Sequence, residues 1–198
     1  MNIREIQSIL NSMVERSQNW VQNNVKIPNE RVYHHLFSSL LTEHCNDKGL
    51  DIWESLIISP EHKTEQQFSW SEVQLGSVTN TRKKALGNGR AGNIDLAILD
   101  KKTIFIEWKG PQVFKKKDVA QTVIKLLSQK DKAIKILAAI TITTPSGRKN
   151  HMDTNTERLQ EEIDFACKVL RLKKPQNFYV YVTCVDREEC HRIHWGKY

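Results

Sequence analysis

The sequence lacks any apolar run of about 18 residues, the length that a membrane-spanning helix requires. Its first residues, Met-Asn-Ile-Arg-Glu-Ile-Gln, also lack the basic and then apolar layout of a signal peptide. The four cysteines do not have the spacing of a disulfide framework, which agrees with a reducing compartment; they are Cys45, Cys167, Cys184 and Cys190. We therefore expect a cytoplasmic protein.

No internal repeat, low-complexity tract or linker divides the chain, so we expect a single domain over residues 1–198. Hydrophobic residues make up 39% and charged residues 27%, as is typical of a globular protein. The net charge of +7 and the pI near 9.2 favour an acidic partner. Nucleic acid is the commonest such partner, because each neutralised phosphate releases counterions. Charge alone does not decide this, since many basic proteins bind no nucleic acid.

The spacing of apolar residues predicts helices over residues 3–22, 29–45, 116–131 and 156–172. Pro28 and Asn29 mark the start of the second helix, and Glu30 lies in its first turn. Strands are predicted at 68–75, 93–99, 103–109, 134–143, 178–185 and 192–195, while Pro60 stops an apolar run at 52–58. Residues 78–92 are predicted to form a basic loop and residues 144–155 a polar loop. This order predicts the α/β class, with a mixed sheet and helices packed on it.

The two strands around residues 100–102 carry the strongest chemical pattern in the sequence. Side chains alternate along a strand, so Glu107 and Lys109 point to one face. A three-residue turn would pair Leu99 with Thr103 and therefore Asp95 with Glu107, whereas a two-residue turn would send Asp95 to the other face. The first register is favoured because it matches the aliphatic faces of the two strands: Ile94, Leu96 and Ile98 would meet Ile104, Ile106 and Trp108.

Two facing carboxylates repel each other unless a cation or a proton lies between them. Carboxylate oxygens suit Mg²⁺ or Mn²⁺, and Lys109 adds a point charge that could hold a phosphate or an attacking water. Such a set can hydrolyse a phosphodiester. An isolated match of this kind is more often an ordinary hairpin with charges on a solvated face. Here the Ile-Phe-Ile run that precedes Glu107 favours a buried site.

Residues Gly92–Lys109 resemble the core of the PD-(D/E)xK nucleases, the restriction-endonuclease-like superfamily. The predicted order over roughly residues 28–143 is similar to that family's α-β-β-β-α-β core, with the N-terminal helix and the C-terminal helix and strands as additions. Asn93 stands where the name of the motif has proline. The sequence signature is confined to the hairpin and is moderately specific.

The resemblance implies roles for individual residues. Asp95, Glu107 and the backbone carbonyl of Trp108 would be metal ligands, and Lys109 would be the catalytic lysine. Many members place a glutamate near the metal from the first core helix, for which Glu30 is the candidate and Glu43 the alternative.

The helix predicted at 116–131 carries Gln121 and Lys125 four residues apart, on one helical face. They resemble the Q-x-x-x-Y motif of one nuclease branch, with Lys125 in place of the tyrosine, so Gln121 is a further candidate catalytic residue. A solvated helix face explains this weak motif equally well. Basic residues on both sides of the hairpin suit contacts to phosphates; they are Arg82, Lys83, Lys84, Arg90, Lys115, Lys116 and Lys117.

Two other groups of residues are less favoured as sites. Cys184, Cys190, His191 and His194 suggest zinc only superficially, because zinc-binding cysteines normally come as closely spaced pairs. His34 and His35 are predicted to serve the surface or core of their helix rather than catalysis.

These observations favour a Mg²⁺-dependent DNA endonuclease, with Mn²⁺ as an alternative ion and a homodimer as one plausible assembly. An RNA nuclease keeps the same chemistry. A protein of this fold that binds nucleic acid without cutting it is the rival from another class, although a binding surface has no need for clustered carboxylates that face phosphates.

Overall fold

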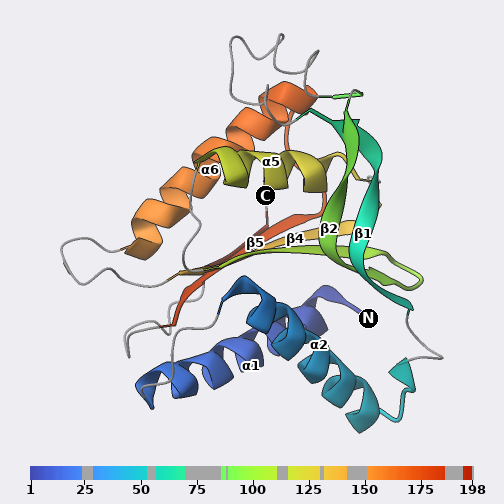
Figure 1. Ribbon diagram of the computed structural model, residues 1–198, viewed down its shortest axis with the longest axis vertical. Helices are drawn as coiled ribbons and strands as arrows, with labels where there is room; N and C mark the ends of the chain where they lie inside the picture. The colour runs from blue at the N-terminus through green and yellow to red at the C-terminus, as the bar shows by residue number, and fades with distance from the viewer. Residues whose placement is uncertain are drawn as a thin grey trace.

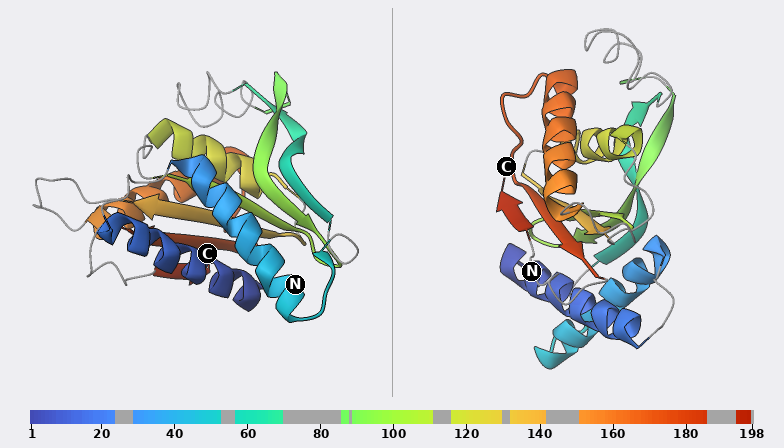
Figure 2. Two further views of the ribbon diagram at one scale, coloured as in Figure 1. Left: turned by 60° about the horizontal axis from the view of Figure 1, so that its bottom comes forward. Right: turned by 90° about the vertical axis from the view of Figure 1, so that its left-hand side faces the viewer.

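The computed structural model describes residues 1–23, 29–52, 57–69, 86–87, 89–110, 116–129, 132–141, 151–185 and 194–197. Its elements form an α/β fold in three layers (Figure 1). Helices α1 (Ile3–Gln22) and α2 (Glu30–Asp47) cover one face of a sheet. Helices α5 (Lys116–Leu127) and α6 (His151–Leu170) cover the other face, as both views of Figure 2 also show.

The described part of the sheet contains six strands in the order of the sequence. They are β1 (Ile57–Phe68), β2 (Arg90–Leu99), β3 (Ile104–Lys109), β4 (Ile134–Thr141), β5 (Phe178–Cys184) and β6 (His194–Lys197). Strands β1, β2 and β3 are antiparallel, β3, β4 and β5 are parallel, and β6 is antiparallel to β5. The parallel pairs require crossover connections, and α5 and α6 provide them on one face.

Two apolar clusters hold the layers together. One joins α1 and α2 to Leu96, Ile106 and Ile136 on the sheet. The other joins α5 and α6 to the opposite face, through residues such as Phe105 and Val180. Strand β4 lies between both clusters and every residue in it is buried, which explains its nearly continuous apolar sequence.

The predicted register of the β2–β3 hairpin is confirmed. Leu96 pairs with Ile106 and Ile98 pairs with Ile104, as a three-residue connection between Leu99 and Thr103 requires. One prediction about its faces is wrong, because Ile94 packs in the cluster with α5 and α6, whereas Leu96 and Ile98 pack in the cluster with α1 and α2. Strict alternation therefore breaks between Ile94 and Leu96, and β2 curves out of the plane of the sheet along its length (Figure 1).

The first strand also differs from the prediction. It spans residues 57–68 instead of 68–75, of which residues 70–75 lie outside the described residues. Pro60 does not stop it, because β1 lies at the edge of the sheet, where a missing N–H is tolerated. Polar residues such as Thr64 and Gln66 occupy its covered face, so its sequence lacks the apolar alternation of a typical strand.

Other boundaries shift by a few residues. Helix α6 begins at His151, so residues 151–155 are helical and the predicted polar loop is wrong there. Arg90 to Gly92 belong to β2 and not to the basic loop. Helix α5 ends at Leu127, four residues before the predicted end. Strand β6 covers His194–Lys197, and residues 192–193 of the predicted strand lie outside the described residues. Among the described residues, no helix has the length and apolar character needed to span a membrane.

The connection into β2 depends on Gly89. This residue has a φ of +96°, and a Cβ added to it would lie 2.2 Å from the carbonyl oxygen of Phe68. Gly87 has a similar φ of +83°, but a Cβ there would meet nothing within 4 Å. Substitutions at the two glycines therefore distinguish the cost of an unfavourable backbone conformation, which both share, from the cost of a steric clash, which only Gly89 has.

We expect Gly89→Ala to destabilise the protein more than Gly87→Ala. Each substitution forces alanine into the left-handed region, which costs about 1–2 kcal/mol. Only Gly89→Ala adds the clash with the end of β1. Chemical denaturation of both variants measures the difference, and equal losses of unfolding free energy would contradict the packing described here.

Candidate metal centre

Asp95 lies where β2 and β3 diverge. Continuing the confirmed register by one residue places Asp95 opposite Glu107, as predicted. Here the backbone pairing of β2 with β3 ends, and the backbone N–H of Trp108 donates a hydrogen bond to the side chain of Asp95 instead, to Oδ2 over 2.8 Å. This hydrogen bond fixes the carboxylate of Asp95 at the open end of the hairpin.

Helix α2 brings Glu30 to the same place. The helix starts there because the side chain of Asn29 accepts a hydrogen bond from the backbone N–H of Val32. Glu30 is then the first helical residue, and its Oε2 accepts a 2.9 Å hydrogen bond from the backbone N–H of Gly110. A Cβ on Gly110 would lie 3.1 Å from the Cβ of Glu30, so this close approach favours glycine directly after β3.

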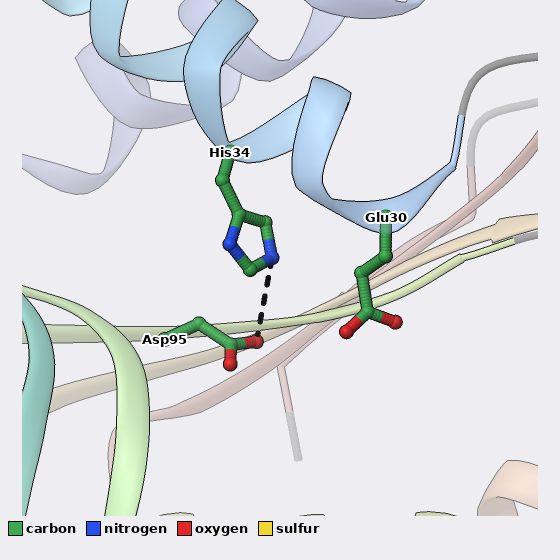
Figure 3. Close-up of side chains that lie close together, drawn as sticks. All are labelled: Glu30, His34 and Asp95. Carbon is green, nitrogen blue, oxygen red and sulfur yellow. Dashed lines mark ion pairs between the residues drawn. The ribbon is translucent and has the colours of Figure 1, made fainter.

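His34 lies one helical turn after Glu30 and completes a group of three. Figure 3 shows both α2 side chains directed toward Asp95 on β2. One potential ligand atom from each of Glu30, His34 and Asp95 lies within 4.8 Å of the others, so the three could hold a metal ion. His34 Nε2 lies 3.7 Å from Asp95 Oδ2, and its ring packs at 4.8 Å from the Trp108 ring.

Glu107 is the most buried carboxylate of the site, with none of its surface exposed. Lys125 of α5 forms an ion pair with its Oε1. Within the described part of the chain, neither carboxylate oxygen of Glu107 has a partner that meets hydrogen-bond geometry. Such a group is expensive to keep in its charged form unless a nearby cation compensates it.

Burial and, to a smaller extent, the negative charge of Asp95 raise the pKa of Glu107 to about 8. Lys125 and Lys109 act in the opposite direction but do not outweigh the loss of water. Without a further cation, the site therefore favours a proton on Glu107. A divalent ion beside Asp95 and Glu107 would supply that missing positive charge.

The remaining predicted site residues are placed as follows. Lys109 is half-buried at the end of β3, and Gln121 is half-buried on α5, one turn before Lys125. Glu43 does not join the site; it pairs with Arg16 over 2.6 Å on an exposed surface. It stands 13 residues after Glu30, about 20 Å along the helix at 1.5 Å per residue.

Only part of the predicted phosphate-contacting set can be located. Arg90 is exposed near the start of β2. Lys116 and Lys117 begin α5, and only their backbone is described. Arg82, Lys83, Lys84 and Lys115 lie outside the described residues, as do Cys190 and His191 of the less favoured zinc group.

Sequence reasoning missed His34 and Lys125 as parts of the site. The signal for His34 was its spacing of four from Glu30, which places both residues on one face of α2. Lys125 was noted only as a substitute for a tyrosine. Its contact with Glu107 depends on how α5 packs on the sheet, which the sequence does not specify.

We expect a pH-dependent stability that originates at Glu107. Because the folded-state pKa is raised from 4.5 to about 8, this group stabilises the metal-free protein below pH 4.5, and the contribution is lost as the pH rises through about 8. Glu107→Gln should remove this contribution to the pH dependence of the unfolding free energy, whereas Glu43→Gln should keep it. Unfolding free energies measured in EDTA between pH 5 and pH 9 test this. The same slope in wild type and Glu107→Gln would contradict the assignment.

The candidate site takes its side chains from four separate elements of the fold. Helix α2 supplies Glu30 and His34, β2 supplies Asp95, β3 supplies Glu107 and Lys109, and α5 supplies Lys125. A scan of protein-family models finds no match to this chain, and searches of curated proteins and of solved structures find none either.

Proposed function

We propose that this chain is a metal-dependent nuclease that hydrolyses phosphodiester bonds in DNA, with a restriction-endonuclease-like core. The order of elements from α2 to β4 supports the core assignment, since it reads α-β-β-β-α-β with the last two strands parallel. The observation that carries the function is the group of Glu30, His34 and Asp95 at the open end of one hairpin, together with the buried Glu107 carboxylate, whose charge interacts with that of Asp95. Lys109 stands two residues after Glu107 on the same strand.

The donor set fits a divalent metal ion. Carboxylate oxygens suit Mg²⁺ and Mn²⁺, and the imidazole of His34 is a ligand that Mn²⁺ accepts more readily than Mg²⁺. Among the described residues, Glu107 Oε2 has no hydrogen-bond partner, while Oε1 forms the ion pair with Lys125. We infer that Glu30, Asp95 and Glu107 hold the ion, with His34 and the carbonyl of Trp108 as additional candidates.

Each side chain then has a separate task in hydrolysis. A bound divalent ion supplies Lewis acidity and offsets the charge that develops on the phosphate. Glu30 and Asp95 are fixed by backbone N–H groups, so both carboxylates are oriented before substrate arrives. Lys109, whose positive charge acts on Glu107, provides an ammonium that can orient the attacking water or the scissile phosphate.

The charge of the chain supports a nucleic-acid substrate. The net charge of +7 favours binding to phosphates, and exposed Arg90 lies on the strand that carries Asp95. The preference for DNA over RNA comes from the resemblance of the hairpin to DNA-cutting enzymes. A homodimer stays a prediction.

We expect wild-type protein to cut plasmid or single-stranded DNA only when Mg²⁺ or Mn²⁺ is present. Asp95→Asn and Lys109→Met should each lower the rate more than about 100-fold, beyond what the loss of an outer-shell partner of a metal site typically costs. Glu43→Gln is the matched control, because this glutamate lies on the same helix as Glu30 and contacts only Arg16 among the ion pairs described. It should cut like wild type.

The outcomes separate the proposed function from its rivals. Cutting of RNA alone would change the substrate but keep the site. Tight DNA binding at low salt without cutting by any metal would favour a non-catalytic binding protein. Cutting that survives both Asp95→Asn and Lys109→Met would overturn the site.

A further inference from the structure

Lys125 reaches the site from the opposite side to α2. It lies on α5, and its ammonium contacts both Glu107 Oε1 and the backbone carbonyl of Asn93. Its side chain is 15% exposed, and the Glu107 side chain that it contacts is buried. The ion pair between Arg16 and Glu43 contrasts with this, because its side chains are 47% and 52% exposed.

The strand below Lys125 leaves space for its stem. A Cβ added to Gly92 would lie 3.0 Å from Cδ and 3.4 Å from Cγ of Lys125. The Gly92 backbone N–H is in turn held by Thr64 Oγ1 over 2.9 Å. Gly92 thus leaves room for the stem of Lys125, and the Asn93 carbonyl accepts a hydrogen bond from its ammonium. Together they direct the ammonium at Glu107, the most buried carboxylate of the site.

The position of Lys125 has a consequence for metal binding. A divalent ion on Asp95 and Glu107 would share a carboxylate with an ammonium that is already bound there. Two cations on one buried carboxylate repel each other strongly, because the surrounding protein screens charge far less than water does. Because this repulsion is unfavourable, the ion and the Lys125 ammonium compete for Glu107.

We propose that Lys125 is a positioning residue that serves as the resident cation of the metal-free site, and that a divalent metal ion must displace its ammonium from Glu107 in order to bind. This inference rests on the proposed function, because it takes Glu107 as a metal ligand. It assigns Lys125 a regulatory role in the same site: the lysine holds the Glu107 side chain when metal is scarce and sets the metal concentration at which the site is loaded.

The first test compares Mn²⁺ binding by wild type, Lys125→Met and the control Lys168→Met, an exposed lysine near the end of α6. In EDTA, Lys125→Met should melt at a lower temperature than wild type. Titration with Mn²⁺ should show tighter binding by Lys125→Met, by about 5–150-fold, the range typical of coupling between two ligands of one protein. Lys168→Met should match wild type in both measurements. Unchanged or weaker Mn²⁺ binding by Lys125→Met would overturn the inference.

The second test needs no substitution at Lys125 and so does not depend on the folding of that variant. Wild-type protein is labelled briefly with acetic anhydride with and without Mg²⁺, and acetylation of Lys125 is measured by mass spectrometry. Labelling of Lys125 should increase several-fold with Mg²⁺ in wild type and stay constant in Asp95→Asn. No increase in a wild-type protein that Mg²⁺ stabilises would overturn the role of Lys125 but leave the metal site standing. If neither Mg²⁺ nor Mn²⁺ stabilises wild type, the proposed function and this inference fail together.

Discussion

The burial of the Glu107 carboxylate is the constraint on which the rest of the site depends. A carboxylate without exposed surface must be neutralised by a proton, a lysine or a metal ion. The fold supplies Lys125 from one side, while Asp95 adds a second negative charge beside it. Glu107 therefore retains a preference for its neutral form that only further positive charge can remove, which makes this end of the hairpin suited to a divalent cation.

The sheet topology explains why these groups meet. The paired part of antiparallel β2 and β3 begins at Leu96, and before it the gap at Asp95 is closed by the hydrogen bond from the Trp108 backbone N–H to Asp95. Helix α2 reaches the gap from one face through Glu30, and α5 reaches it from the other through Lys125. Each approach is close enough to favour a glycine, Gly110 for the helix and Gly92 for the lysine. The site is thus built where both helical layers contact one break in the sheet.

The hairpin could be predicted from sequence because its pattern is local. Matching aliphatic faces set the register that pairs Leu96 with Ile106, and Asn29 marked the start of α2. Two failures have physical reasons. Strand β1 carries polar residues on its covered face and a proline at the edge of the sheet, so its sequence does not alternate as strands usually do. The contacts of Lys125 with Glu107 and Asn93 join residues 18 and 32 positions apart through tertiary packing, which periodicity does not encode.

The most direct test of a metal centre at Asp95 is the anomalous scattering of crystals soaked in Mn²⁺, recorded near the manganese absorption edge. The account predicts one strong peak in contact with carboxylate oxygens of Asp95 and Glu30, and adjacent to Glu107. The absence of a peak there at millimolar Mn²⁺, or a peak only at exposed acidic groups such as Glu43, would contradict it.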